Sequence, residues 1–227
     1  MTDSKTNPFA SWLKYLGFVW DIPAKTIEIP KAKKACYLAK LEPWTPNHKF
    51  SKKDAESVLS TLVHCSLVLS NVQSCLPAIS HFTSSFDHFT LPFICLPPSL
   101  TVASNIAWWW SQLSSSFCST TLSKPPAASS IKFWVDASSL WGIGVIFGGL
   151  WDAWKLKTGW HKDGHNISWA EIVAIKLGLL LAIHLGYFEI HFLIKSDNQG
   201  VIQAIKGRKS RNFQQNLVLQ CIMLLLS

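Results

Sequence analysis

The segment Ile131-Lys-Phe-Trp-Val-Asp136-Ala-Ser138 opens the half of the chain in which the sequence pattern is most regular. Its apolar and β-branched residues predict a strand over Ile131–Ala137, with Asp136 at the end of the strand. A similar segment, Phe188–Ser196, predicts a later strand, and Asp197 follows it directly. If these two strands are neighbours, the two aspartates emerge at the same edge of one sheet.

The residues between these two segments predict the remaining elements of the same half. Trp141–Phe147 alternates around two glycines and favours a second strand, and a third is expected near Trp151–Lys157. Ser168–Leu185 has the pattern of a helix closed by a glycine. Two further helices are expected, over Gln199–Ile205 and Phe213–Leu226. The order β-β-β-α-β-α-α predicts an α/β (α+β) fold, in which helices pack on a mixed sheet.

Glu171 lies at the start of the predicted helix Ser168–Leu185, and two interpretations remain open for it. Ser168-Trp-Ala-Glu171 has the pattern of a capping box, in which the glutamate only binds the serine amide. Alternatively, Glu171 joins Asp136 and Asp197, which singly could be ordinary turn residues. Three converging carboxylates repel one another, and a divalent metal is the usual compensation. We therefore predict Asp136, Glu171 and Asp197 as catalytic residues and as ligands of Mg²⁺ or Mn²⁺.

The charge balance of the chain favours an anionic partner. Lysine and arginine number 21 against 13 acidic residues, which gives a net charge of +8. Such a balance is typical of nucleic-acid-binding proteins, although many basic proteins bind nothing charged. A Lys-rich helix expected from Pro30 to Leu41 either meets phosphates or faces water. The candidate nucleic-acid-binding residues are Lys31, Lys33, Lys34, Lys206, Arg208, Lys209 and Arg211.

The small, polar, proline-containing stretch 119–130 predicts a linker between residues 1–118 and 131–227. In the first part, Tyr15–Trp20 and Thr26–Ile29 are expected as strands on either side of a turn. Ser51 predicts the cap of a helix that runs to about Leu69, with Asp54 near its positive end. Three adjacent tryptophans, Trp108–Trp110, cannot share one helical face. At least one of them is therefore expected to be exposed or to pack against another domain, although base stacking is also open.

Cysteine usage and hydropathy exclude several classes of protein. No two of the six cysteines have C-x-x-C spacing, which argues against a zinc site. Met1 leads into polar residues rather than a secretory signal, and no uninterrupted apolar run has the length of a membrane span. We expect an intracellular protein of the cytoplasm or nucleus that has no membrane partner.

Four motifs together resemble a known family. The chain resembles the ribonuclease H domain of retrotransposon reverse transcriptases in four segments: the one ending at Asp136-Ala-Ser138, Trp141-Gly-Ile-Gly144, Ser168-Trp-Ala-Glu171 and Ser196-Asp197-Asn-Gln199. This resemblance implies that the three acids hold two Mg²⁺ ions and that the domain cuts the RNA strand of an RNA–DNA hybrid. Residues 12–69 resemble the segment where the palm of a reverse transcriptase gives way to thumb and connection. The resemblance therefore implies a mainly helical thumb and connection region before a ribonuclease H-like domain.

The same resemblance also has departures. The polymerase motif Tyr-x-Asp-Asp is absent, so no polymerase activity is expected. The fourth acidic residue of the family would lie beyond Ser227, so we expect an incomplete domain with impaired cleavage. Arginine is scarce, with two residues against twelve tryptophans, as in a transposon copy whose arginine codons have decayed. The alternative function is therefore a non-catalytic, nucleic-acid-binding remnant.

Overall fold

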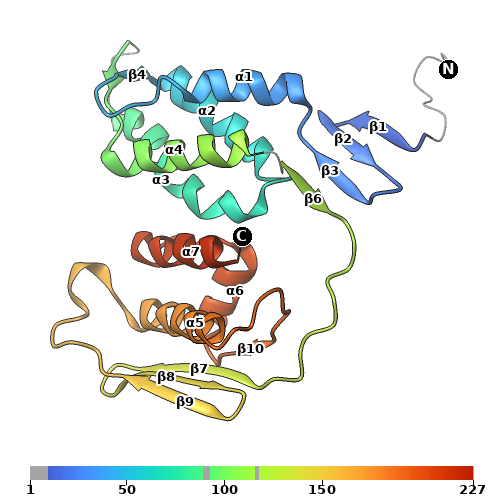
Figure 1. Cartoon of the computed structure of the whole chain (residues 1–227). Coiled ribbons are helices and arrows are strands. Elements are labelled where there is room, and N and C mark those ends of the chain that lie inside the picture. The colour runs from blue at the N-terminus through green and yellow to red at the C-terminus, as the bar shows by residue number, and fades with distance from the viewer. Residues whose placement is uncertain (1–9, 89–92, 116–117, 227) are drawn as a thin grey trace. The chain divides into compact units, whose positions relative to one another are not determined.

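The computed structural model of the chain describes residues 10–88, 93–115 and 118–226 (Figure 1). Its contacts divide the chain into two compact units. The N-unit comprises residues 1–70 and 78–124, and the C-unit comprises residues 71–77 and 125–227. The division falls between Lys124 and Pro125, within the predicted linker 119–130. Ser119–Thr121 at the start of this segment are not a linker, because they form strand β6 and pair with another strand of the N-unit.

The N-unit contains a four-stranded antiparallel sheet in the order β1-β2-β3-β6. Strands β1 (Trp12–Tyr15) and β2 (Phe18–Asp21) form a hairpin, followed by β3 (Thr26–Glu28). The prediction of one strand over Tyr15–Trp20 was wrong, because Leu16 and Gly17 take φ values of 51° and 82° and turn the chain. Two positive φ values in a two-residue loop are typical of a tight hairpin turn.

Helices make up most of the rest of the first 118 residues. They are α1 (Lys31–Leu41), α2 (Lys52–Cys65), the 3-10 helix η2 (Ser70–Cys75), α3 (Leu76–Ser85), the 3-10 helix η3 (Phe86–His88) and α4 (Leu100–Ser114). Two short strands, β4 (Phe50–Ser51) and β5 (Cys95–Leu96), pair antiparallel. The core side chains of these helices include Leu62 of α2, Ile79 of α3 and Trp109 of α4, none of which is measurably exposed.

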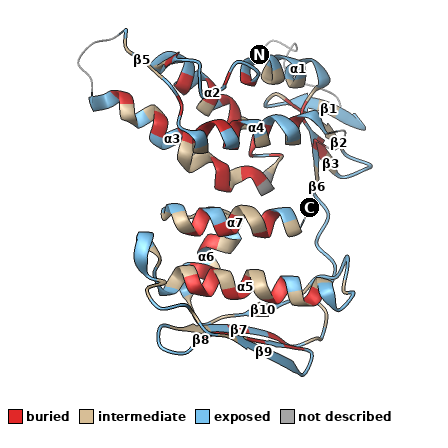
Figure 2. Ribbon diagram, turned by 60° about the vertical axis from the view of Figure 1, so that its left-hand side comes forward, coloured by how far each residue is buried: buried red, intermediate tan, exposed pale blue. Residues whose placement is uncertain are grey.

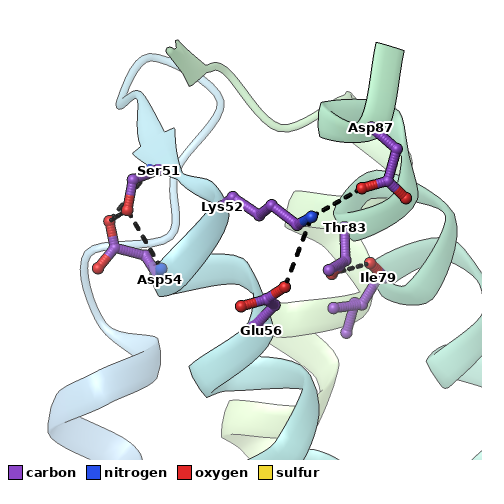
Figure 3. Close-up of polar contacts among 7 residues, drawn as sticks. All are labelled: Ser51, Lys52, Asp54, Glu56, Ile79, Thr83 and Asp87. Atoms are coloured by element: carbon purple, nitrogen blue, oxygen red, sulfur yellow. Dashed lines mark hydrogen bonds and ion pairs between the residues drawn. The ribbon is translucent and has the colours of Figure 1, made fainter. Parts of the chain in front are cut away.

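The start of α2 follows the local signal in the sequence (Figure 3). The Ser51 hydroxyl accepts a hydrogen bond from the Asp54 amide, and the Asp54 carboxylate accepts one from the Ser51 amide. This reciprocal pair is the predicted cap. Lys52 then pairs with Asp87 at 2.7 Å and with Glu56 at 3.9 Å. The helix ends at Cys65, four residues before the predicted end at Leu69.

The three adjacent tryptophans lie on α4 in three different environments. Trp109 is fully buried, Trp108 is half-buried and Trp110 is 44% exposed. A helix advances about 100° per residue, so neighbouring side chains cannot all face one core. The expectation that at least one of the three is exposed is confirmed.

The C-unit contains a four-stranded mixed sheet in the order β10-β7-β8-β9. Its strands are β7 (Phe133–Ser138), β8 (Gly142–Phe147), β9 (Leu150–Trp154) and β10 (Ile194–Lys195). Strand β10 is parallel to β7, and the other pairs are antiparallel. Its helices are the 3-10 helix η4 (Lys162–Gly164), α5 (Ile167–His184), α6 (Gln199–Gly207) and α7 (Phe213–Leu225). The predicted order and the mixed α/β class are confirmed.

One strand is much shorter than predicted. Of the segment Phe188–Ser196, only Ile194 and Lys195 form a strand, β10, next to β7. A residue of the segment before this strand, His191, makes hydrogen bonds outside the sheet instead. The His191 carbonyl accepts a hydrogen bond from the Ser129 amide at 2.7 Å, and a His191 ring nitrogen lies 2.7 Å from the Pro126 carbonyl.

Helix α5 packs directly against β7 and β8 on one side and against α7 on the other. Gly178 permits this approach, because a Cβ atom there would lie 2.4 Å from the Phe133 ring. Figures 1 and 2 show α5, α6 and α7 on one side of strands β7 to β9, whose other side carries no helix from the described residues of the C-unit. The core of the C-unit is therefore one-sided, and no described helix of this unit covers the outer face of its sheet.

Helix α5 is also long and apolar enough to span a membrane, with a mean hydropathy of 1.7 over 18 residues. In this structure its apolar side chains form the centre of a core cluster that includes Ile172, Ile175 and Leu179. A helix buried on two sides is apolar around most of its circumference, which accounts for its hydropathy.

Candidate functional site

The parallel pairing of β10 with β7 brings two predicted site residues together. Ile194 is level with Phe133, and Lys195 is level with Trp134. Continuing this register by two residues places Asp197 level with Asp136. Both side chains are exposed. Asp136 does not end its strand as predicted, since β7 continues to Ser138.

Glu171 enters the same site from α5. The capping-box interpretation of Ser168 and Glu171 is wrong: Asn166 caps the helix, and its side chain accepts a hydrogen bond from the Trp169 amide at 2.9 Å. The helix therefore begins at Ile167, and Glu171 lies in its second turn rather than its first. Because Asn166 already supplies the cap, Glu171 has no capping role.

The structure brings the three predicted acids into one cluster. Each of Asp136, Glu171 and Asp197 offers a carboxylate oxygen, and these oxygens all lie within 4.8 Å of one another. The two aspartates are exposed, whereas Glu171 is only 3% exposed. Its Oε2 atom is buried without a hydrogen-bond partner. An unpaired buried polar atom is costly, which favours a ligand at this position.

The electrostatics of the cluster act mainly on Glu171. Burial, together with the negative charges of Asp136 and Asp197, raises the pKa of Glu171 from 4.5 to about 7. Hydrogen bonds from the Ala137 amide and the Ser196 side chain oppose this rise. Near neutral pH the buried glutamic acid is therefore only partly ionised, and a bound cation would favour its carboxylate form.

Two polar residues that were given no role from the sequence hold the cluster in place. The Asn198 side chain caps α6 by accepting a hydrogen bond from the Val201 amide at 3.1 Å, and it donates to the Ser168 hydroxyl at 3.4 Å. The Ser196 hydroxyl bonds Glu171 and accepts from the Asn198 amide at 3.2 Å. These contacts tie the start of α5 to the loop that carries Asp197. An Asn directly before a predicted helix is a cap signal, so the sequence already pointed to Asn198.

The residues present fit a divalent metal. Three carboxylates supply hard oxygen ligands, the type that Mg²⁺ and Mn²⁺ prefer over nitrogen and sulfur. Neighbouring hydrogen bonds orient these ligands, as in established metal sites. The cluster can therefore hold a metal ion.

The predicted basic residues fall into two groups, one in each unit. Lys31 and Lys33 lie exposed on α1, whereas the ammonium of Lys34 donates to the Ser115 carbonyl and is thus committed within the N-unit. In the C-unit, Lys206, Lys209 and Arg211 are exposed around the end of α6. Arg208 is half-buried, and burial lowers its pKa. Helix α6 starts just after Asp197, so this second basic group stands one helix length, about 12 Å, from the carboxylates.

A pocket of about 570 Å³ opens beside the carboxylates on the outer face of the sheet. Its lining residues are Trp134, Val135, Asp136, Gly144, Val145, Ile146, Trp151, Asp152, Ala153, Lys195, Ser196 and Asp197. The pocket was not foreseen from the sequence. The alternation of β7 does place Trp134 and Asp136 on one face, which is the signal that could have found it.

Comparison with family models gives one match in this unit. Residues 143–227 match the family described as reverse transcriptase-like. This part of the chain is similar to that family, and we call it the reverse transcriptase-like region. Comparisons with curated proteins and with solved structures gave no significant match.

The reverse transcriptase-like region includes Glu171 and Asp197 but starts after Asp136. It covers α5, α6 and α7 and most of the mixed sheet. Its family and its mixed α/β architecture agree with a ribonuclease H-like fold for the C-unit. Such a family implies nucleic acid as partner. The comparison of residues 12–69 with a palm and thumb lies outside the matched range and stays a prediction.

Proposed function

We propose that the C-unit, which contains the reverse transcriptase-like region, is a metal-dependent nuclease that hydrolyses the RNA strand of an RNA–DNA hybrid. The observation that carries this proposal is the cluster of Asp136, Glu171 and Asp197, whose carboxylate oxygens lie within 4.8 Å of one another in the unit whose residues 143–227 match this family. Mg²⁺ or Mn²⁺ is the cofactor that suits this ligand set.

Asp136, Glu171 and Asp197 would hold the metal, and the exposure or hydrogen bonding of each side chain suits this role. Bound divalent metal supplies an activated water and stabilisation of the leaving oxygen of a phosphodiester. The exposed Asp136 and Asp197 leave the open side of the cluster accessible to a phosphate. The buried Glu171 closes the opposite side against solvent, and hydrogen bonds from Ala137 and Ser196 favour its ionised, ligating form.

The basic end of α6 would hold the nucleic-acid backbone. Lys206, Lys209 and Arg211 lie one helix length from the carboxylates. They would therefore contact phosphates at some distance from the cleavage point. Lysine and arginine bind phosphates without regard to base identity. Recognition of a hybrid would then rest on helix shape and 2′-hydroxyl contacts.

A cleavage assay tests this proposal. The full chain is incubated with an end-labelled RNA–DNA hybrid in Mg²⁺ and, separately, Mn²⁺, beside Asp136→Asn and Asp197→Asn. We expect cleavage of the RNA strand that both variants lose and that EDTA stops. Duplex DNA of the same sequence serves as the substrate control and should stay intact.

The same assay decides between the nuclease and the non-catalytic remnant. Cleavage that both variants retain at the wild-type rate reflects contamination and contradicts the proposal. Binding of the hybrid without any cleavage, in both metals, would assign the chain to the remnant. The N-unit lysines Lys31 and Lys33 would then contribute to binding alone.

A further inference from the structure

The outer face of the C-unit sheet carries an ordered row of side chains across all four strands. Lys195 is level with Trp134, Trp134 with Ile146, and Ile146 with Trp151. We call these four residues the aromatic row. The Lys195 ammonium lies 4.4 Å from the centre of the Trp134 ring, a cation–π contact. Trp134, Ile146 and Trp151 are 44%, 47% and 77% exposed.

The next row on the same face combines the aspartates with small residues. Asp136 is level with Gly144, and Gly144 is level with Ala153. A Cβ atom built on Gly144 would meet nothing within 4 Å. The two rows are two residues apart along the strands, about 7 Å. The small residues therefore leave a hollow floor, with the carboxylates at one end and the aromatic row as its wall.

This arrangement forms the pocket of about 570 Å³, which is continuous with the carboxylate cluster. A contiguous patch of exposed apolar side chains on a folded surface often marks a binding site. Here they lie beside a cation and next to the site where a phosphate would be held. The features of the pocket match the parts of a nucleotide, with flat apolar rings for a base and an ammonium for a phosphate.

We propose that the aromatic row is a stacking platform for an unpaired base of a nucleic-acid strand whose backbone passes the carboxylates. The proposal deepens the proposed nuclease function and rests on it for the path of the strand. Base stacking on Trp151 and Trp134 tolerates any sequence, because every base has a flat face. Lys195 meets a neighbouring phosphate and keeps the Trp134 ring in place. Single-stranded RNA or DNA is the ligand class.

Binding of labelled oligonucleotides to the full chain tests this platform. A single-stranded oligonucleotide is titrated in EDTA at constant salt, and fluorescence anisotropy gives its affinity. We expect Trp151→Ala to weaken binding about 5- to 100-fold, the range that loss of one stacked base produces. An abasic oligonucleotide of equal length should bind wild type as weakly as the normal one binds Trp151→Ala.

Trp141→Ala is the matched control, since Trp141 is 84% exposed in the turn between β7 and β8 and does not line the pocket. It should bind like wild type. Equal affinity of Trp151→Ala and wild type, or equal binding of abasic and normal strands, would overturn the platform. Self-association that Trp151→Ala abolishes, seen by sedimentation, would assign the face to a second copy of the chain and also overturn it.

These outcomes stay separate from those of the nuclease. The titration is run without divalent metal, so it measures binding in the absence of cleavage. Loss of hybrid cleavage together with intact Trp151-dependent binding contradicts the nuclease and leaves the platform. Cleavage together with Trp151-independent binding contradicts the platform and leaves the nuclease.

Discussion

Glu171 and Asp136 hold carboxylate oxygens within 4.8 Å of each other, although one lies on a helix and the other on a strand and the two residues are over thirty positions apart in the chain. Glu171 is 3% exposed, and its Oε2 atom has no hydrogen-bond partner. Without a cation this arrangement opposes folding, because like charges and burial both disfavour the ionised glutamate. The effect of this pair on the free energy of unfolding can be measured independently of any activity.

The stability of the metal-free protein should fall as pH rises. Glu171 titrates near 4.5 when unfolded and at about 7 when folded, so the folded state binds the proton more tightly. Its contribution is fully present below pH 4.5 and is lost as pH passes 7, a difference of about 3 kcal/mol. Glu171→Gln should remove this loss. Urea unfolding in EDTA should then show the variant to be more stable than wild type at pH 8 and similar at pH 4.

A glutamate elsewhere provides the control for that titration. Glu42→Gln changes an exposed side chain in the N-unit and should leave the pH profile of wild type unchanged. If wild type and Glu171→Gln have parallel profiles from pH 4 to 8, the buried glutamate does not carry the raised pKa.

Asn198 should position the metal site as well as cap α6. Asn198→Ala removes a helix cap, which costs about 1 kcal/mol, and also the hydrogen bond to Ser168. Asn212→Ala is a matched control, because Asn212 caps α7 with the same 3.1 Å bond and has no contact with the carboxylates. Both variants should lose similar stability in thermal unfolding, but only Asn198→Ala should weaken Mn²⁺ binding. Equal Mn²⁺ affinity in the two variants would leave Asn198 as a cap alone.

Gly178 should be required for packing of α5 on the sheet. Alanine normally favours a helix over glycine by about 1 kcal/mol. Here its Cβ would lie 2.4 Å from the Phe133 ring, which is itself packed against Phe147 and Phe192. We expect Gly178→Ala to destabilise the fold by about 1–3 kcal/mol in urea unfolding, as overpacking does. A stability gain would show that the helix and sheet are farther apart than described.

The basic end of α6 should set the salt dependence of nucleic-acid binding. Replacing Lys206 and Arg211 together by alanine removes two phosphate contacts, so the slope of log affinity against log salt should decrease by about 1–2. The measurement is hybrid binding between 50 and 200 mM salt, in EDTA. Lys14→Ala, an exposed lysine of β1, should leave the slope unchanged. Equal slopes for the double variant and wild type would exclude the end of α6 from the interface.

Much of the fold was predictable because its signals are local. Ser51 with Asp54 started a helix where the capping pattern predicted one, and the order of elements in the C-unit followed from hydrophobic periodicity. The same capping pattern was wrong at Ser168, because Asn166 two residues earlier takes the cap. A four-residue motif cannot decide which of two nearby residues caps the helix, since that choice depends on where the helix packs.

The carboxylate site was predictable in composition but not in geometry. Strand-end aspartates indicated a shared sheet edge, and the parallel register of β10 with β7 then decided that Asp197 is level with Asp136. The length of β10 could not be foreseen, because Phe188–Leu193 has strand-like residues but is not part of a strand in the described structure. The aromatic row likewise depends on cross-strand register, which the sequence of one strand does not contain.

The most direct measurement of the central claim is a calorimetric titration of Mn²⁺ into the full chain at pH 8. We predict saturable binding that Asp136→Asn, Glu171→Gln and Asp197→Asn each weaken at least tenfold, while the folded state of every variant persists by circular dichroism. Wild-type affinity retained in all three variants, or no binding to wild type at millimolar Mn²⁺, would contradict a metal centre formed by these carboxylates.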